Sequence, residues 1–212
     1  MSDEEQAVLD FFNKEENLPL GLSVAELVDG IRQRMNNEFW MALHGQLTAL
    51  LTQYALPWKV ETTEDRNASE CIVGLYLQPV AEQTLFLRPM LEQQAMGETV
   101  RIYYGLAWSA APTPENTRLA PVTRLRETLH DEGFKNNEHF LAWGWTPYRP
   151  RRKDFLLRLS TEKDVLLGEV TDLIRHLLVD HGAALAAANA ALREVPRSAA
   201  VSLDKLRANL KH

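Results

Sequence analysis

Histidines are the side chains of this sequence best suited to chemistry, because imidazole exchanges protons near neutral pH and binds transition metals. Two of the six, His176 and His181, stand five positions apart in a segment with a helical pattern. In a helical metal site the two histidines are four positions apart and share one face. Neither a cysteine nor a second carboxylate cluster accompanies this pair, so we predict no metal site.

Other reactive side chains have simpler structural explanations. His130 falls at the end of a predicted helix, where unpaired carbonyl groups favour a cation, and His44 lies on the face of another helix. The single cysteine, Cys71, sits in an apolar run, which is typical of a small core residue rather than a nucleophile.

The sequence contains no Gly-rich phosphate loop, no G-x-S-x-G element and no zinc-type cysteine spacing. Nucleotide hydrolysis, acyl transfer through serine and zinc-finger folding each depend on one of these patterns. We therefore predict no catalytic residue and no cofactor, and the sequence favours a protein without catalytic activity.

A stretch rich in aromatic residues and cations, Trp143 to Phe155, is the strongest candidate for a binding surface. Proteins that hold single-stranded nucleic acid stack bases on exposed rings and neutralise phosphates with nearby cations. In the alternative interpretation, Trp143 and Trp145 point into the core from one sheet face and the cations only solubilise a turn. In the binding interpretation, the residues that contact a protein or nucleic-acid partner are Tyr148, Arg149, Arg151, Arg152 and Lys153.

The overall composition limits the classes of partner. The chain has 212 residues, with 29 acidic against 23 basic side chains and a formal charge of -6. This balance argues against a protein that coats DNA or an anionic membrane through its overall field, although it allows a local basic patch. The lone cysteine, the acidic N-terminus and the lack of an apolar run of about 20 residues favour a soluble cytoplasmic protein with no membrane partner.

Two helices are predicted before the first strand. Residues 1–22 have the pattern of an acidic helix followed by a break, which Pro19 helps to cause. Ser23 and Glu26 have the spacing of a capping box, so a long helix over residues 23–56 is expected to begin there.

Residues 57–160 change to short β-rich runs and are predicted to form an antiparallel sheet with one inserted helix. Pro121 in the first turn and Gly133 after the last turn mark the bounds of that helix. The residues between the last two strands, TPYRPRRK, are then the tip of a hairpin. The expected strands are WKVETT, ECIVGLYLQP, QTLFLRPM, TVRIYYGLAWS, HFLAWGW and DFLLRLS.

A last long helix is predicted over residues 161–195, and its second half is rich in alanine. Small side chains permit close packing, so a homo-oligomer through this helix is one expectation. Residues 196–212 follow as a basic tail. Together the elements predict a single α+β domain over residues 1–212, an antiparallel sheet of about five or six strands packed against two long helices, with shorter helices at the N-terminus and the C-terminus.

The order of the segments is the basis of a family resemblance. A helix bearing NNEFWMALHGQL, the runs CIVGLYL and RIYYGL, the tryptophan-rich HFLAWGW and a final helix after DFLL follow one another. This order resembles the C-terminal half of bacterial PD-(D/E)XK nuclease superfamily proteins. In that family the nuclease core lies upstream and holds Mg²⁺ with an acidic residue and a strand that carries Glu or Asp two positions before Lys. Glu70 has no such lysine, so no catalytic residue is carried over.

The resemblance implies an accessory module that contributes recognition, regulation or assembly. We therefore expect a non-catalytic interaction or regulatory domain that binds a protein or nucleic-acid partner through the turn from Tyr148 to Lys153, in a bacterial setting such as phage defence. The alternative is a PD-(D/E)XK-like metal-dependent nuclease whose carboxylates converge from distant positions.

Overall fold

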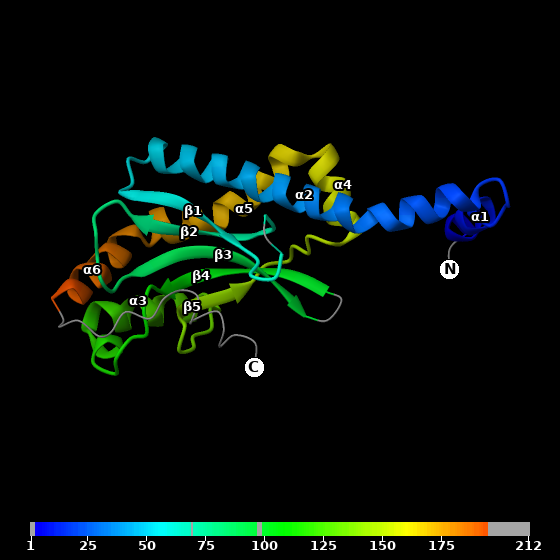
Figure 1. The fold of residues 1–212 in the computed structure, drawn as a ribbon. Helices are drawn as coiled ribbons and strands as arrows, with labels where there is room; N and C mark the ends of the chain where they lie inside the picture. Colours follow the sequence, from blue (N-terminus) through cyan, green and yellow to red (C-terminus); the bar gives the residue numbers. More distant parts are fainter. Residues whose placement is uncertain (1–2, 69, 97–98, 195–212) are drawn as a thin grey trace.

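A computed structural model describes residues 3–68, 70–96 and 99–194 of the chain (Figure 1). Its centre is one five-stranded antiparallel sheet in which sequence neighbours are also spatial neighbours, in the order β1-β2-β3-β4-β5. The α+β fold and the antiparallel meander are therefore confirmed. The strands are β1 (Trp58–Glu64), β2 (Ile72–Pro79), β3 (Leu87–Met96), β4 (Thr99–Trp108) and β5 (Phe140–Trp145).

Helices surround the sheet and account for most of the remaining described residues. The longest of them, α2, has 36 residues. A short 3-10 turn precedes α3, and a π-helical turn, η2, separates α5 from α6. The bounds are α1 (Asp3–Phe12), α2 (Leu18–Gln53), η1 (Asn116–Arg118), α3 (Ala120–Asp131), α4 (Lys153–Thr161), α5 (Lys163–Arg175), η2 (His176–Asp180) and α6 (Gly182–Arg193).

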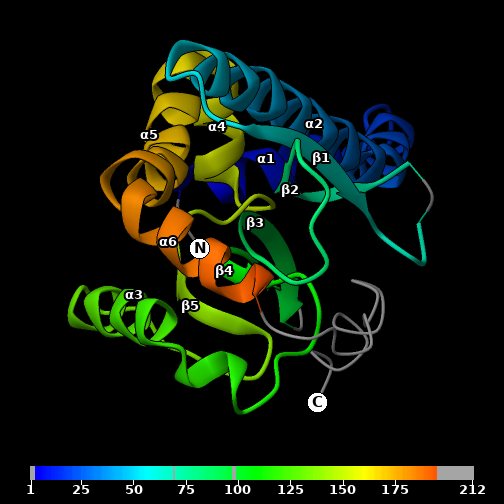
Figure 2. The same ribbon diagram turned by 90° about the vertical axis from the view of Figure 1, so that its left-hand side faces the viewer.

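One face of the sheet carries the main hydrophobic core. Helix α2 packs on β1 and β2, α5 on β4 and α6 on β3, and Figure 2 shows α5 and α6 along this side of the sheet. Because side chains alternate along a strand, Ile102 and Leu106 of β4 are both fully buried here. Helix α2 adds Phe39 and Trp40, which are also fully buried. The C-terminal half of α2 is thus fixed in the core.

The opposite face of the sheet carries a smaller aromatic cluster. Tyr103 and Phe140 are buried in it, and Trp143 and Trp145 pack against them while half-buried. Strand pairing places Trp145 opposite Tyr103 and Trp143 opposite Gly105. Both tryptophans therefore lie on one sheet face, as the core interpretation of this stretch predicts.

The strand predicted for DFLLRLS is wrong, since this segment forms helix α4. Phe155 and Leu159 are buried, whereas Leu157 between them is 54% exposed. Residues two apart share one face of a strand, but residues four apart share one face of a helix, so this burial follows the helical period. The stretch from Trp143 to Phe155 is consequently a strand-to-helix connection and not a hairpin tip.

Helix α2 begins earlier than the sequence indicated. Asn17 occupies the N-cap position and Leu18 is the first helical residue, so Ser23 lies inside the helix and the predicted capping box is wrong. Pro19 does not break the helix, because a proline in the first turn removes no intrahelical hydrogen bond. The interruption between α1 and α2 lies at residues 13–17.

The helix predicted over residues 161–195 is divided into α5, η2 and α6, and it starts only at Lys163. The basic tail predicted at residues 196–212 lies outside the described residues. None of the helices in the described part of the chain combines the length and the apolar character that a membrane crossing requires.

Candidate metal centre

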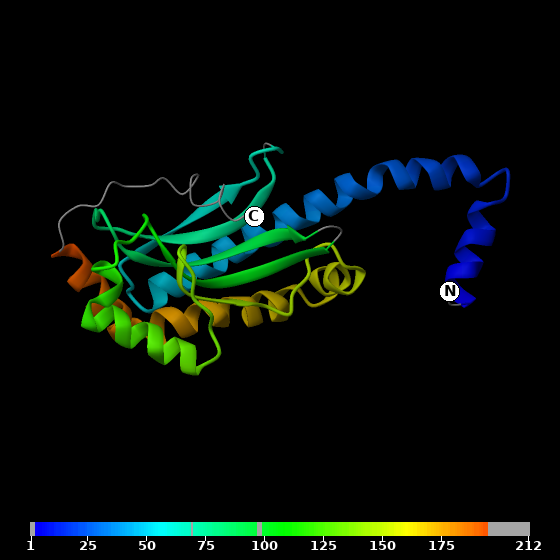
Figure 3. The same cartoon turned by 90° about the horizontal axis from the view of Figure 1, so that it is seen from below.

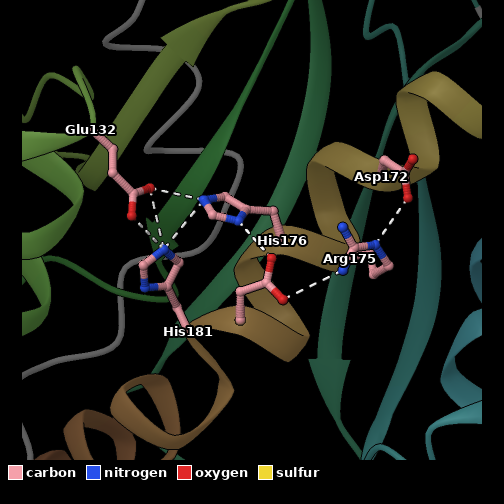
Figure 4. Close-up of polar contacts among 6 residues, drawn as sticks. Glu132, Asp172, Arg175, His176 and His181 are labelled. Carbon is pink, nitrogen blue, oxygen red and sulfur yellow. Dashed lines mark hydrogen bonds and ion pairs between the residues drawn. The ribbon is translucent and has the colours of Figure 1, made fainter.

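Three potential metal ligands from two distant parts of the chain converge (Figure 4). Glu132 follows the last residue of α3, His176 is the first residue of η2, and His181 follows η2. Their ligand atoms all lie within 4.8 Å of one another, and no other group of this kind occurs among the described residues. We call these three residues the Glu–His–His cluster.

The contacts inside the cluster are short. The Nε2 atom of His176 lies 2.8 Å from Oε2 of Glu132, and Nε2 of His181 lies 3.0 Å from Oε1 of the same carboxylate. The two Nε2 atoms are 3.3 Å apart. The His181 side chain is only 10% exposed, whereas those of His176 and Glu132 are 36% and 35% exposed. The cluster is therefore open to solvent on one side.

The π-helical turn brings together two histidines that the sequence spacing appeared to separate. Five positions on an α-helix correspond to about 140° around the axis. In the π-helical turn η2 the backbone hydrogen bonds span five residues instead of four. The backbone N–H of His181 donates to the carbonyl of His176 at 3.2 Å. The two rings consequently meet edge to face, with centroids 4.7 Å apart. The expectation that this spacing keeps the imidazoles apart is wrong, and the argument against a metal site that rested on it fails.

Glu132 reaches the histidines because α3 packs on α6. The apolar side of α3 includes Leu125 and Leu129, which are buried at helical spacing. After Glu132 the chain turns through Gly133, whose φ of +93° is in the left-handed region that favours glycine. No linear spacing connects Glu132 with residues more than 40 positions away, so the sequence offered no signal for this third ligand.

Asp180 fixes the orientation of the His176 ring. A carboxylate can only accept hydrogen bonds, so Nδ1–H of His176 donates to Asp180 Oδ2, at 2.9 Å. In the neutral ring, Nε2 then presents its lone pair to Glu132. Arg175 holds Asp180 from the other side at 3.4 Å and also donates to Asp172 at 2.9 Å. Metal-binding histidines commonly have such a carboxylate partner on the second ring nitrogen.

The pKa values in the cluster move in the directions that keep its members charged. The hydrogen bond from His176 lowers the pKa of Glu132 and also that of Asp180. Hydrogen bonds to Asp180 and then to Glu132 raise the pKa of His176. A protonated His176 therefore donates from Nε2 to Glu132, whereas in the neutral ring the Nε2 lone pair faces Oε2 of the carboxylate. Either a proton or a metal ion between them makes this approach favourable.

The spacing of the donors fits a divalent transition metal. Ligands about 2.0–2.2 Å from a tetrahedral zinc ion are separated from one another by about 3.3 Å. The imidazole nitrogens of His176 and His181 have this separation, at 3.3 Å. Imidazole and carboxylate donors suit zinc and its neighbours in the first transition row. Three protein ligands would leave one coordination position for water or another small ligand.

A cavity of about 230 Å³ opens beside Glu132. Burial, followed by the charge of Glu132, raises the pKa of the Tyr104 phenol, which therefore stays neutral. The Lys135 ammonium lies 5.9 Å from the centre of the Trp143 ring, and the indole N–H of Trp143 has no hydrogen-bond partner in the described part of the chain. The cavity thus combines aromatic walls with polar donors. Its lining residues are Tyr104, Glu132, Gly133, Phe134, Lys135, Trp143, Gly144 and Trp145.

Tyr148, the aromatic member of the predicted binding turn, is tied into the structure. Its hydroxyl donates to Glu169 at 3.1 Å, and its ring packs edge to face on Phe155 with centroids 6.5 Å apart. Burial, together with the hydrogen bond to Glu169, raises the pKa of Tyr148 to about 12. This ring supports α4 and α5 and is half-buried, so it is not presented as a stacking platform.

The cations of the predicted turn divide into two groups. Arg152 forms an ion pair with Asp154 at 3.2 Å. Arg149, Arg151 and Lys153 are exposed, and the structure gives them no ion pair within the described residues. These three side chains are therefore available to an anionic partner.

The other reactive residues of the sequence, Cys71, His44 and His130, lie outside the Glu–His–His cluster. Cys71 is half-buried, and burial raises the pKa of its thiol, which makes it a poor nucleophile. His44 contacts the carbonyl of Val60 through Nε2 at 3.3 Å. His130 is exposed on α3, two residues before Glu132.

No protein-family model matches the sequence, and neither the curated proteins nor the solved structures include a significant match. The resemblance to the PD-(D/E)XK superfamily therefore stays a prediction.

Proposed function

We propose that this protein binds a divalent transition metal ion through Glu132, His176 and His181. The observation that carries the proposal is the convergence of two imidazole Nε2 atoms, 3.3 Å apart, on a single carboxylate. The Asp180 carboxylate on the other nitrogen of His176 supports it, because this arrangement raises the basicity of a histidine ligand.

Zinc is the ion that this donor set favours, since imidazole and carboxylate donors suit it and the two nitrogens lie at tetrahedral spacing, with the carboxylate oxygens 2.8 and 3.0 Å from them. A zinc ion held by three protein ligands keeps an open position and acts there as a Lewis acid. In the proposed site, Glu132 both holds the ion and forms part of the cavity wall. Tyr104 and Lys135 would then place a phenol and an ammonium group near a small molecule that enters the cavity.

Isothermal titration calorimetry of the purified chain with Zn²⁺ tests the proposal. We expect one ion per chain with micromolar or tighter affinity. His176→Gln and His181→Gln should each weaken binding by at least about 100-fold, because losing a ligand costs more than losing an outer partner, for which 10- to 100-fold is typical. His130→Gln is the matched control and should bind like the wild type. Absence of saturable binding, or full binding by His181→Gln, contradicts the proposal.

A second candidate function is the binding of single-stranded nucleic acid in the cytoplasm, as an interaction or regulatory domain of the kind that the family resemblance implies. The observation in its favour is that Arg149, Arg151 and Lys153 are exposed. Without a free tyrosine ring, the proposed contacts are to phosphates, so affinity should fall steeply with salt.

Fluorescence anisotropy with a labelled single-stranded oligonucleotide tests this second function. The double variant Arg149→Glu/Arg151→Glu should lose binding at least about 10-fold at low salt, because two phosphate contacts become repulsive. The matched control, Arg118→Glu/Arg124→Glu, changes two exposed cations elsewhere on the surface. Equal affinity in both variants rules out the loop as the binding site.

A further inference from the structure

The N-terminal part of the chain projects from the rest of the molecule (Figures 1 and 3). We define the arm as residues 3–34, which comprise α1, the turn at residues 13–17 and the part of α2 that precedes Met35, the residue at which α2 meets the core. The first buried residue of α2 is Asn36, and no residue between 3 and 35 is buried in the described structure. The arm is therefore helical without being packed on the body.

The arm has a defined internal structure. The ring of Phe12 lies over Gly21, where a Cβ atom would come within 2.9 Å of the ring. The side chain of Asn17 donates to the carbonyl of Phe11 at 3.0 Å. These contacts fix the turn at residues 13–17, from which α1 leaves at a steep angle to α2 (Figure 3).

The arm nevertheless exposes a large amount of apolar surface. Apolar side chains that are each about half exposed add up to an area on the order of several hundred Å², which marks an interface more often than a free surface. A partner that covers these side chains would remove their apolar surface from water and so stabilise the arm. The exposed side chains are Val8, Leu9, Phe11, Leu18, Leu20, Leu22, Val24, Leu27 and Ile31.

The apolar residues of α2 follow the pattern of a helix–helix seam. Leu20, Val24, Leu27 and Ile31 are spaced by four, three and four positions and are 43% to 63% exposed. A spacing that alternates between three and four keeps one stripe facing a partner helix. The stripe is therefore suited to a second α-helix.

Gly30 lies beside the stripe, and no contact in the described part of the chain requires a glycine at this position. A Cβ atom at this position would meet no other atom within 4 Å, although glycine in a helix interior costs about 1 kcal/mol relative to alanine. Gly30 also lines a hollow of about 390 Å³ together with Arg34, Glu38 and Met41. A glycine beside a hollow allows another helix to approach closely.

The charges beside the stripe fit a second copy of the same helix. Glu26 and Arg34 are each four positions from Gly30, on the same ridge of the helix. If two copies cross antiparallel at Gly30, Glu26 of each copy lies opposite Arg34 of the other. Within the described part of the chain, the ion pair of Arg34 is with Glu38, at 3.7 Å, and both side chains are mostly exposed, so the interaction is weak. The surface is thus complementary to itself, as a twofold interface requires.

We infer that the arm is a dimerisation element in which the α2 helices of two chains pack antiparallel at Gly30. The seam would bury Leu27 and Ile31 of both copies, which lie within three positions of the crossing, whereas Leu20 and Val24 would lie level with the start of the partner's body. This inference is independent of the metal site, to which the arm contributes no residue.

Light scattering coupled to size-exclusion chromatography at tens of micromolar tests the inference. The wild type should have twice the 24.1 kDa mass of one chain. Leu27→Glu/Ile31→Glu should be monomeric, with dissociation at least about 100-fold more favourable, because four charges would be buried at the seam. Its circular dichroism should show that the body remains folded.

The matched control is Leu157→Glu/Val165→Glu, which replaces exposed apolar residues on α4 and α5 and should stay dimeric. Gly30→Leu should also weaken the dimer although it raises helix propensity. A monomeric wild type overturns the inference. So does a dimer that persists in Leu27→Glu/Ile31→Glu, which would point instead to another surface such as the alanine-rich α6.

Discussion

At the scale of single residues, the two nitrogens of His176 have different partners and different roles. Nδ1 donates to Asp180, and Nε2 faces Glu132 and His181. The tautomer is therefore set by Asp180, and the direction of the free lone pair is set with it. The proposed metal affinity depends on this outer contact as well as on the three ligands.

Asp180→Ala should weaken Zn²⁺ binding by 10- to 100-fold, the range found when the outer partner of a histidine ligand is removed. Asp180→Asn should have a smaller effect, because the amide oxygen still accepts from Nδ1–H while the negative charge is lost. Calorimetry measures both affinities. Asp131→Asn changes an exposed carboxylate next to Glu132 and serves as the control. Equal affinities in all three variants would exclude Asp180 from any supporting role.

The contact between Tyr148 and Glu169 predicts a pH dependence of stability away from the metal site. The Tyr148 pKa rises from 10.0 to about 12 on folding. Between these pH values the unfolded chain releases the phenolic proton and the folded chain retains it, so the free energy of unfolding should fall as pH rises. Urea unfolding at pH 9 and pH 11 measures the change. In Tyr148→Phe this alkaline decrease should be smaller, and an unchanged slope would contradict the assignment.

At acid pH the free energy of unfolding should change in the opposite direction, rising as the pH rises. Hydrogen bonds from Arg158 and Tyr148 lower the pKa of Glu169 below its ordinary value of 4.5. The stabilisation from this carboxylate is present above pH 4.5 and is lost as the pH falls through the lowered value. Because the side chain is 42% exposed, solvent screening keeps the contribution small. Glu169→Gln should therefore be less sensitive to acid than the wild type by a modest margin in the same unfolding experiment.

At the scale of elements, apolar periodicity identified the sheet and the long helices, but it did not identify the local departures that form the site. Four runs of alternating residues became strands β1, β2, β4 and β5 close to the expected positions, because strand burial follows a two-residue period. The π-helical turn has no such signature. Its backbone bonds span five residues, and they depend on how α5 and α6 pack, which a single sequence does not display.

The segment 154–160 shows how a short apolar run can mislead. Phe155, Leu157 and Leu159 alternate with other residues as in a strand, but Phe155, Leu156 and Leu159 also have the spacing of one helix face. Short runs of this kind satisfy both periods. The structure resolves the ambiguity, because Phe155 and Leu159 are buried while Leu157 is exposed.

Alanine substitutions distinguish the two interpretations of this segment in solution. Phe155→Ala should lower the free energy of unfolding by about 3 kcal/mol or more, because it leaves a cavity in the core. Leu157→Ala should change it by about 0.5 kcal/mol or less, since the side chain is on the surface. A strand would place both residues on the same face and give similar losses. Denaturant unfolding of the two variants measures the difference.

At the scale of the whole molecule, the chain consists of a body with one shared core and an arm that contributes nothing to it. The main cluster of buried residues begins at Phe39 and ends at Leu192. The Glu–His–His cluster lies just after α3 and at the two ends of η2, within that body. Metal binding and self-association should therefore be separable, since no described contact links the arm to the cluster.

Removal of residues 2–32 tests this separation. The shortened chain should be monomeric by light scattering and should bind Zn²⁺ with an affinity within about 3-fold of the wild type, a difference well below 1.4 kcal/mol. Its unfolding should be independent of protein concentration, whereas that of the wild type should shift with concentration, because association stabilises only the folded state. A shortened chain that stays folded but no longer binds Zn²⁺ would contradict independence, since it would mean that the arm positions Glu132, His176 or His181 through the dimer.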